Sequence, residues 1–391
     1  MTHKKIPCFL DLLERWEEVK PSTSNSTSIQ LFANLKPGKL RSTTTQKVVV
    51  KISPPSDAND NALEVERGIY IYIHKQIARD TPHILEGLLE GTCESDDVVK
   101  EWKHDDDPRK QSLYKEYFAM RIAKEWPLVS TARKKQIQKA FAKCNIPMTA
   151  HNLAMRAKLT LEPKPIRYVI TPRLFDVPLG DFLIDEEWAR TRATLTVTDI
   201  YSIMLQMAQG LYVLGQKKIM HNDLHTNNIF IKVGAHYRAI SYMVPTKCAL
   251  LARAFVCFYD FDHGTGPEFH NTTLDNDFCE SLGECNEFIA NWDWYTFLSS
   301  LDEILSYEDN NVPVPPILKK LIQKANPETD AFMGRPCECV KRDKKDPKQC
   351  LHCNVKRDFL ANMMSPEAFF LFYLEKAKTH GQINDQDLFL F

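Results

Sequence analysis

The 391-residue sequence predicts an α+β protein in which a smaller, β-rich lobe precedes a larger, helical lobe. Two early runs, residues 28–35 and 47–52, are rich in the apolar and β-branched residues that favour strands, and Pro37 and Gly38 between them favour a turn. Residues 199–218 carry apolar side chains three and four positions apart, which is typical of an amphipathic helix. A chain of this length can form two hydrophobic cores.

The other elements follow from the same periodicities. The first twenty residues repeat apolar side chains at helical spacing, so residues 1–28 are expected to form a helix and a Ser/Thr-rich linker. We expect residues 29–172 to form the β-rich lobe, with a charged, mostly helical insertion at about residues 94–165, and residues 173–391 to form the helical lobe. The single segments expected are a helix at 61–78, strands at 83–92, 166–175, 229–233 and 255–262, a short helix after residue 178, and helices beyond residue 286.

The bulk composition limits the partners that can be expected. The formal net charge is −1, and a neutral protein has no general attraction for nucleic acid or for a membrane surface, although this total does not exclude a local basic patch. No run of about 18 apolar residues exists, so we expect no membrane span. The start of the chain lacks the apolar run of a secretory signal, and the eleven cysteines are scattered, which favours reduced cysteines and a cytoplasmic location.

A polar run, HNDLHTNN from His221 to Asn228, lies between the strongest predicted helix and a predicted strand. It places the carboxylate of Asp223 five residues before the carboxamide of Asn228. A carboxylate can accept or orient the proton of a hydroxyl group, and a carboxamide oxygen can bind a cation such as Mg²⁺. The run matches the form H-R-D-L-x-x-x-N at its His, Asp, Leu and Asn positions, and so resembles the catalytic loop of the protein kinases.

A second carboxylate motif follows a predicted hairpin. Its residues, Asp260-Phe261-Asp262, come directly after an apolar strand and resemble the D-F-G metal motif of the same family. The resemblance implies that Asp260 holds Mg²⁺ against the phosphates of ATP. Asp262 replaces the usual Gly, and its carboxylate would either add a metal contact or cap the next turn.

Upstream residues extend the resemblance. The run VVVKI resembles the V-A-I-K strand, which implies that Lys51 contacts the α- and β-phosphates of ATP. A Lys in an apolar strand must be paired, and the expected partner is Glu66 on the next helix, with Glu64 as the alternative. The glycine-rich loop of the family is reduced to Gly38.

These motifs together resemble the bilobal protein-kinase-like fold over roughly residues 29–305. The combination of HNDLHTNN, YDFD and a later W-D motif is most similar to the kinase-like proteins of large DNA viruses. In the kinase family the Asp of that last motif, here Asp293, bonds the backbone of the catalytic loop. The resemblance implies a Ser/Thr protein kinase of a large DNA virus, located in the host cytoplasm or the virion. It would use ATP and Mg²⁺, a protein hydroxyl as acceptor, and His221, Asp223 and Asn228 as catalytic residues.

Several departures from the family keep two other functions open. Asn222 replaces the Arg of the catalytic loop, no A-P-E tripeptide follows Asp262, and His225 stands where Ser/Thr kinases usually carry Lys. The H-x-D-L-H-x-x-N form resembles the aminoglycoside and choline phosphotransferases, so a small-molecule kinase is the first alternative. The weak glycine loop supports the second, a non-catalytic pseudokinase that acts as a scaffold. Neither the phosphate acceptor, the activation mechanism nor the oligomeric state follows from the sequence.

Four late cysteines have the spacing of metal ligands. They form a C-x-C pair and a C-x-x-C pair with ten residues between them, within residues 337–353: Cys337, Cys339, Cys350 and Cys353. Four thiolates at this spacing suit a closed, structural Zn²⁺ site, in which His352 could replace one thiolate. The alternative is a set of reduced surface cysteines or a pair of disulfides.

Overall fold

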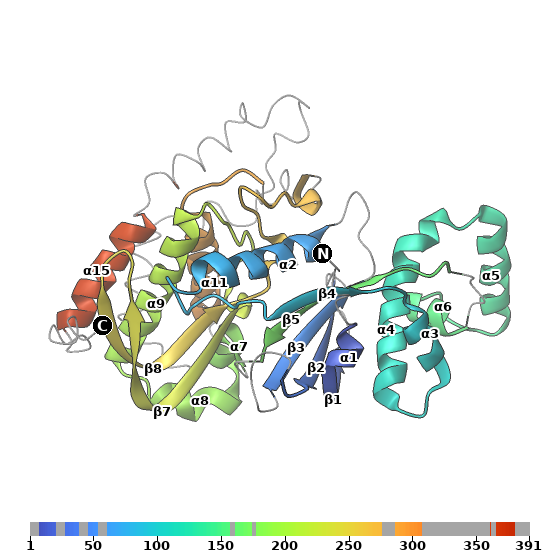
Figure 1. The fold of residues 1–391 in the computed structure, drawn as a ribbon, viewed down its shortest axis with the longest axis horizontal. Coiled ribbons are helices and arrows are strands. Elements are labelled where there is room, and N and C mark those ends of the chain that lie inside the picture. The colour runs from blue at the N-terminus through green and yellow to red at the C-terminus, as the bar shows by residue number, and fades with distance from the viewer. Residues whose placement is uncertain are drawn as a thin grey trace. The chain divides into compact units, whose positions relative to one another are not determined.

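The chain divides into two compact units, which Figure 1 shows as ribbons. Unit 1 comprises Met1–Asp57 and Gly87–Arg173, and unit 2 comprises Ala58–Glu86 and Leu174–Phe391. The computed structural model describes these residues: 8–20, 28–38, 46–53, 61–156, 161–173, 177–275, 286–306, 360 and 365–379. No helix in these ranges is both long enough and apolar enough to cross a membrane.

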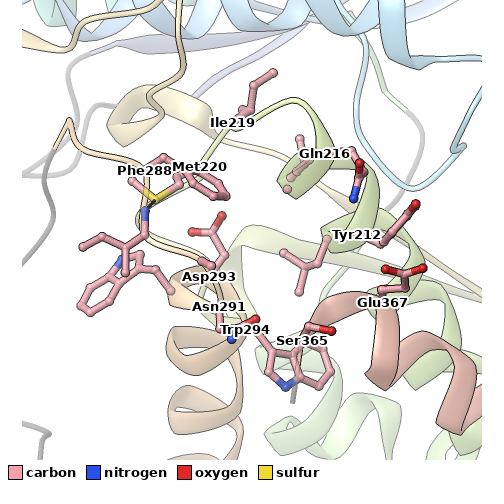
Figure 2. A pocket seen from close by; sticks show the side chains of 16 residues that line it. Tyr212, Gln216, Ile219, Met220, Phe288, Asn291, Asp293, Trp294, Ser365 and Glu367 are labelled. Carbon is pink, nitrogen blue, oxygen red and sulfur yellow. Dashed lines mark hydrogen bonds between the residues drawn. The ribbon is translucent and has the colours of Figure 1, made fainter. Parts of the chain in front are cut away.

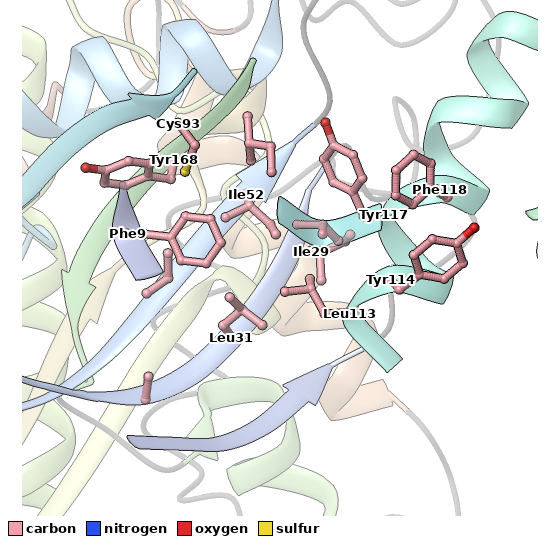
Figure 3. Close-up of a cluster of buried hydrophobic side chains, with 14 of the residues drawn as sticks. Phe9, Ile29, Leu31, Ile52, Cys93, Leu113, Tyr114, Tyr117, Phe118 and Tyr168 are labelled. Carbon is pink, nitrogen blue, oxygen red and sulfur yellow. The ribbon is translucent and has the colours of Figure 1, made fainter. Parts of the chain in front are cut away.

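Unit 1 is built on a five-stranded antiparallel sheet with the strand order β1-β2-β3-β5-β4. Its strands are β1 (Leu13–Lys20), β2 (Ile29–Leu35), β3 (Gln46–Ser53), β4 (Leu89–Cys93) and β5 (Ile166–Pro172). Successive residues of a strand point to opposite faces, and four alternate residues of β2, from Ile29 to Leu35, are buried. Together with Phe9, Ile52 and Tyr168 they belong to the core drawn in Figure 3.

The helix predicted for the first twenty residues is wrong beyond its first turn. Only Phe9–Leu12 (α1) is helical, and Leu13–Lys20 forms β1, which pairs with β2. The β1–β2 ladder contains two register shifts, and each adds a residue to β1. As a result Leu13, Trp16 and Val19, three positions apart, all pack against the core. The bulged strand therefore has the apolar spacing of a helix.

The predicted helical insertion is present in unit 1. Its helices are α3 (Asp97–Lys100), α4 (Pro108–Glu125), α5 (Thr131–Lys143) and α6 (Ala150–Arg156), with 3-10 turns at Glu101–His104 and Trp126–Leu128. Arg121 of α4 is 1% exposed, and its guanidinium contacts the buried carboxylate of Asp96. It also donates to Glu125 Oε1 at 2.5 Å and to the main-chain oxygen of Glu162 at 3.0 Å. Because Asp96 precedes α3 and Glu162 precedes β5, this one side chain joins both ends of the insertion.

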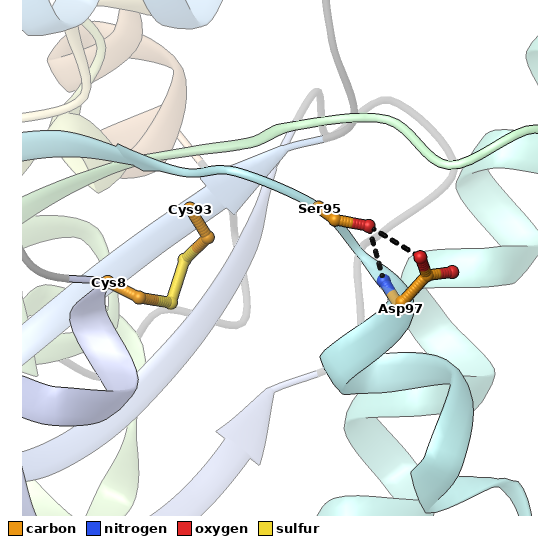
Figure 4. The surroundings of a disulfide bond; sticks show 4 residues. All are labelled: Cys8, Cys93, Ser95 and Asp97. Atoms are coloured by element: carbon orange, nitrogen blue, oxygen red, sulfur yellow. Dashed lines mark hydrogen bonds between the residues drawn. A yellow bond between two sulfur atoms is a disulfide. The ribbon is translucent and has the colours of Figure 1, made fainter.

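One pair of cysteines differs from the prediction that all are reduced. Cys8, before α1, and Cys93, at the end of β4, form a disulfide across 85 residues of sequence (Figure 4). The two meet because α1 packs on β4, which no local sequence pattern indicates. Beyond the disulfide, Ser95 Oγ accepts the main-chain N–H of Asp97 at 3.1 Å, at the start of α3.

Unit 2 combines helices with a three-stranded antiparallel sheet of order β6-β7-β8. The strands are β6 (Val177–Pro178), β7 (Ile229–Tyr242) and β8 (Cys248–Phe258). The helices are α2 (Ala62–Tyr72), α7 (Leu179–Ile184), α8 (Ala189–Ala193), α9 (Val197–Gln216), α11 (Trp292–Ser306) and α15 (Pro366–Thr379); a π-helical turn, Ile73–Ile77, continues α2. A capping box between Thr196 and Asp199 begins α9, which packs against β8 and α15.

The helix α2 groups with unit 2, although we expected residues 29–172 to form one lobe. The hydroxyl oxygen of Tyr70 accepts the main-chain N–H of Asp260 at 2.9 Å, and its ring meets Phe261 edge-on. Asn61, just before α2, donates to the main-chain oxygen of His270 at 2.9 Å. These contacts span about half of the chain, so the order of elements alone could not predict them.

The side chain of His83, in the segment after α2, is hydrogen-bonded to β8 and β7. The residue is fully buried, and its Nδ1 donates to the main-chain oxygen of Val256 at 2.9 Å. Its Nε2 therefore accepts from the hydroxyl of Tyr242, at 2.7 Å. Burial lowers the pKa of His83 from 6.5 to about 4, so the imidazole is neutral at neutral pH.

Replacing Arg121 with Ala should destabilise unit 1 by about 3–5 kcal/mol, because Asp96 would remain buried without its counter-charge. Urea unfolding followed by circular dichroism measures this loss. Lys115→Ala, at an exposed position of the same helix, is the matched control and should stay within about 0.5 kcal/mol of the wild type. Equal midpoints for the two variants would contradict the role of Arg121.

Protonation of His83 should weaken the fold in mild acid. In the unfolded chain His83 takes up a proton near pH 6.5, whereas in the native state it does so only near pH 4. The stabilisation that the neutral ring gives to the unfolding free energy is therefore complete above about pH 6.5. It is lost progressively as the pH falls to about 4, by up to about 3 kcal/mol. His83→Gln should therefore show a shallower fall in unfolding free energy over this interval, whereas His236→Gln, at an exposed site, should keep the wild-type slope. Identical slopes for all three proteins would refute the prediction.

Candidate active site

The two polar ends of the HNDLHTNN run are bonded to each other. Asn228 donates from Nδ2 to the main-chain oxygen of Asp223 at 2.8 Å and to its Oδ2 at 3.2 Å. Asn228 is buried, while the side chain of Asp223 remains 35% exposed. Since Nδ2 faces Asp223, the carboxamide oxygen Oδ1 of Asn228 faces away from it. The loop therefore presents an accessible carboxylate and a fixed carboxamide side by side.

A buried carboxylate at the start of α11 holds this loop. Asp293 accepts the main-chain N–H of His221 and that of Asn222, each at 2.8 Å, through its two different oxygens. The indole N–H of Trp292 donates to the main-chain oxygen of Asn222 at 3.2 Å. These bonds confirm the supporting role expected for Asp293. They also fix Asn222 in a left-handed conformation, with a φ of 66°, which Asn tolerates better than most residues.

The strand pair β7–β8 brings the second carboxylate motif to the loop. Ile229 pairs with Phe258 at the end of the ladder, and Tyr259 donates its main-chain N–H to the oxygen of Asn228 at 3.1 Å. Asp260 is the next residue along the chain. Asn228 and Asp260 therefore lie at the same end of one strand pair.

The imidazole of His221 connects the loop to the same strand end. The residue is fully buried, and its Nε2 lies 2.7 Å from the main-chain oxygen of Tyr259, to which it donates. Burial lowers the pKa of His221 from 6.5 to about 4, so the ring is neutral. Its ring also packs on Phe261, with 4.5 Å between centroids. This geometry gives His221 a positioning role, because a buried ring cannot meet a substrate.

The backbone at Asp260 is held in an uncommon conformation. Its φ of 71° and ψ of 62° place it in the left-handed region, which costs a non-glycine residue of order 1 kcal/mol or more. The bond from its N–H to Tyr70 and the burial of Phe261 stabilise this conformation. Asp262 follows in a 3-10 turn, Phe261–His263, and its main-chain oxygen accepts from Asn271 Nδ2 at 2.7 Å.

The residue that replaces the usual Arg has a structural role of its own. Asn222 donates from Nδ2 to the main-chain oxygen of His263 at 3.0 Å and to Thr265 Oγ1 at 3.2 Å. Its side chain therefore links the loop directly to the segment after the metal motif. In the sequence, Asn222 stands out only as a replacement for the Arg of the kinase motif. Its bonds to His263 and Thr265 were not predicted.

The imidazole of His225 faces the candidate base. Its Nδ1 accepts the main-chain N–H of Asn227 at 3.1 Å, which leaves Nε2 directed at Asp223 Oδ2, at 3.5 Å. Burial acts to raise the pKa of Asp223, but the facing His225 outweighs it, and the pKa lies below its ordinary value of 3.8. Asp223 is therefore ionised at neutral pH.

The oxygen ligands at this strand end suit Mg²⁺ bound together with a nucleotide. Mg²⁺ usually takes one or two protein carboxylates and completes its shell with phosphate and water oxygens. Asp260 supplies a carboxylate, and Asn228 supplies the carboxamide oxygen that faces away from Asp223. This donor set fits the cation expected from the sequence.

The residues predicted to contact ATP lie in different units. Lys51 of β3 is 5% exposed and lies on the face of the strand opposite Val50 and Ile52, which pack into the core. Glu66 of α2 is fully buried, whereas Glu64 is half-buried, which favours Glu66 as the structurally important acid. Because Lys51 belongs to unit 1 and Glu66 to unit 2, their pairing stays a prediction.

Two other expected sites lie at or beyond the limits of the described residues. Gly38 has a φ of 80° in the turn after β2, a conformation that glycine adopts without strain. The residues that follow it, 39–45, lie outside the described part. So do the four zinc-ligand candidates: Cys337, Cys339, Cys350 and Cys353. Among the described residues, no group of three or more His, Cys, Asp or Glu could hold a metal.

A cavity of about 200 Å³ in unit 2 is lined by Ile219 and Met220, the two residues that precede the loop (Figure 2). Its walls include Tyr212 of α9, Met220, and Asp293 and Trp294 of α11. Neither Asp223, Asn228 nor Asp260 lines it. The cavity is thus distinct from the candidate site, although both share Asp293.

Replacing Asp293 with Ala should lower the unfolding free energy by about 2–5 kcal/mol, because two buried N–H groups lose their acceptor. Glu187→Ala, at an exposed position of unit 2, should stay within about 0.5 kcal/mol of the wild type. Chemical unfolding measures both values. A loss below about 1 kcal/mol for Asp293→Ala would mean that the loop keeps its shape without the carboxylate.

Comparison with known proteins identifies the family. Residues 31–241, more than half of the 391-residue chain, match the family model described as protein tyrosine and serine/threonine kinase. The matched range includes Lys51, Asp223 and Asn228, and it confirms the predicted α+β protein-kinase-like fold. No curated protein matches the chain. The chain belongs to the protein tyrosine and serine/threonine kinase family, which makes it a protein-kinase-like phosphotransferase that uses ATP.

Proposed function

We propose that the chain is a Ser/Thr protein kinase, which transfers the γ-phosphate of ATP to a hydroxyl group of a protein. The observation that carries the proposal is the bonding of Asn228 to Asp223 beside the end of β8. This arrangement supports one ionised oxygen for an incoming hydroxyl and a second oxygen, on Asn228, for a cation. Phosphoryl transfer requires that positioning and little covalent chemistry from the protein.

The roles of the residues follow from their positions. Asp223 would accept a hydrogen bond from the acceptor hydroxyl and take up its proton as the phosphate–oxygen bond forms. His221 and Asp293 would position the loop, since both are buried and bond main-chain atoms. Lys51, paired with Glu66, would bind the α- and β-phosphates. Asp260 and Asn228 would hold Mg²⁺, with Asp262 close by and Gly38 in the loop over the phosphates.

The bound Mg²⁺ would neutralise charge on the phosphate oxygens during transfer. Among the described side chains at the loop and the adjoining strand end, His221 is neutral, and Asp223, Asn228 and Asp260 carry a carboxylate or a carboxamide. Asp260 and Asn228 thus have the task of fixing the cation between protein and nucleotide.

A small-molecule kinase is the second candidate. His225 occupies the position where Ser/Thr kinases usually carry Lys, and its Nε2 faces the candidate base Asp223. The same H-x-D-L-H form occurs in the aminoglycoside and choline phosphotransferases that the loop resembles. The protein kinase and the small-molecule kinase would bind ATP through the same residues, so the two proposals differ only in the molecule that accepts the phosphate.

We also propose that the chain comes from a large DNA virus and acts in the host cytoplasm or the virion. The support is the resemblance of HNDLHTNN and YDFD to the kinase-like proteins of such viruses.

Asp223→Asn should reduce phosphate transfer by about 10²–10⁴-fold without unfolding the protein, because the amide cannot take the hydroxyl proton. The assay follows labelled γ-phosphate from ATP into an extract of proteins and small metabolites, with phosphoamino-acid analysis of the protein bands. Asp185→Asn, at an exposed site in unit 2, is the matched control and should keep wild-type activity.

Label on protein Ser or Thr that disappears with Asp223→Asn supports the proposal. Label only in small metabolites would favour the second candidate. Full activity of the Asp223 variant would overturn the role of this residue in either reaction. No transfer by the wild type to any acceptor would favour a non-catalytic scaffold.

A further inference from the structure

The charge of the chain is unevenly distributed along the sequence. Residues 108–164 contain 13 Lys and Arg but only three Asp and Glu, which gives this segment a net charge of +10. Since the whole chain has a net charge of −1, the remaining residues together carry −11. The neutral total, from which we expected no general nucleic-acid binding, therefore conceals a basic segment, in which Arg109, Lys110 and Arg121 pair with acids of the preceding residues 96–107. Such asymmetry is typical of a chain that binds a polyanion through one of its parts.

Within this segment, α5 presents lysines to solvent on one side. Lys135, Lys139 and Lys143 are exposed and follow one another at intervals of four residues. At about 100° per residue, the middle of this row lies about 180° around the helix from Ile137 and Phe141. These two are the residues that α5 buries in the core of unit 1. Packing therefore directs the three lysines, which we call the α5 lysine stripe, away from the core.

The α5 lysine stripe has no counter-charge among the described residues. None of its three side chains makes a hydrogen bond or an ion pair with another described residue, and α5 contains no Asp or Glu. The neighbouring Lys134, by contrast, donates to the main-chain oxygen of Pro127 at 2.9 Å. Like charges four residues apart destabilise a helix, so folding alone does not favour this row.

We propose that the α5 lysine stripe binds the phosphate backbone of a nucleic acid. Gln136 and Gln138 are exposed on the same helix, and Lys with Gln is a composition suited to phosphate contacts. Protein–protein interfaces are instead depleted in Lys and enriched in aromatic residues, and the aromatic residue of α5, Phe141, is buried. A helix that lies in a membrane surface needs a free apolar face, and α5 uses its apolar face for packing.

The contact would not depend on base sequence. Successive lysines of the stripe rise about 6 Å along the helix, so they can follow a row of phosphates with flexible side chains. Figure 1 shows α5 at the outer edge of the insertion, with α4 nearer the sheet of unit 1. Three neutralised phosphates would contribute a slope of about −3 to the dependence of log affinity on log salt concentration for a duplex. The interaction goes beyond the proposed kinase reaction and does not require it.

Fluorescence anisotropy with the full chain tests the proposal. The probes are labelled duplex DNA, duplex RNA and single-stranded DNA of about 20 nucleotides and arbitrary sequence, titrated between about 50 and about 200 mM salt. The combined variant Lys135→Gln, Lys139→Gln and Lys143→Gln should bind the best probe at least about tenfold more weakly at low salt, with a slope reduced by about 3. Gln keeps a high helix propensity, and a thermal melt checks that the variant is folded.

The matched control removes three positive charges from exposed sites of unit 2: Lys75→Gln, Lys232→Gln and Arg238→Gln. It should retain the affinity and slope of the wild type. The proposal would be overturned if the wild type bound none of the probes, or if both triple variants lost the same affinity. It would also be overturned if the wild type bound only a polyglutamate peptide or phosphatidylserine vesicles, and did so through the α5 lysine stripe. None of these readouts uses phosphate transfer, so the proposed kinase function is tested separately.

Discussion

The polar loop that carries the candidate chemistry keeps its shape because one buried carboxylate accepts two of its main-chain N–H groups. Asp293 bonds His221 and Asn222, and this fixes the turn from which the other contacts follow. His221 can then reach the main-chain oxygen of Tyr259, and Asn228 can reach Asp223. Apart from the bond between Asn228 and Asp223, the loop is thus held by Asp293 and His221, two residues that would touch neither substrate nor cation.

The charge around this loop would require a cation to accompany a bound polyphosphate. Asp223 is ionised, Asp260 lies at the adjoining strand end, and the nearby His221 is neutral because burial lowers its pKa. A polyphosphate would be repelled by such a surface unless a divalent ion lay between the carboxylates and the phosphate oxygens. The insertion of unit 1 shows the reverse arrangement: its lysines on α5 have no acidic neighbours on that helix.

Sequence patterns predicted the parts of the fold in which local periodicity and packing agree. The long helix α9 and the strands β2 and β3 were predicted from the spacing and type of their apolar residues. The motifs at Asp223 and Asp260 were recognised by their resemblance to kinase motifs. The prediction failed where long-range packing decides the structure: β1 has helical spacing because of its bulges, and Cys8 meets Cys93 only in three dimensions. The link from Asn222 to the segment after the metal motif belongs to the same class, since its partners are some 40 residues away. These three features depend on residues far apart in the sequence, so they become visible only in the folded structure.

We propose that Asp260 and Asn228 together hold a cation under the phosphates of a nucleotide. Calorimetric titration of ATP into the protein, with Mg²⁺ and with a chelator, measures whether they do. Mg²⁺ should tighten ATP binding in the wild type, and Asp260→Asn should remove this gain while Asp185→Asn keeps it. ATP affinity that is the same with and without Mg²⁺, or a gain that survives in Asp260→Asn, would show that these residues do not hold the cation.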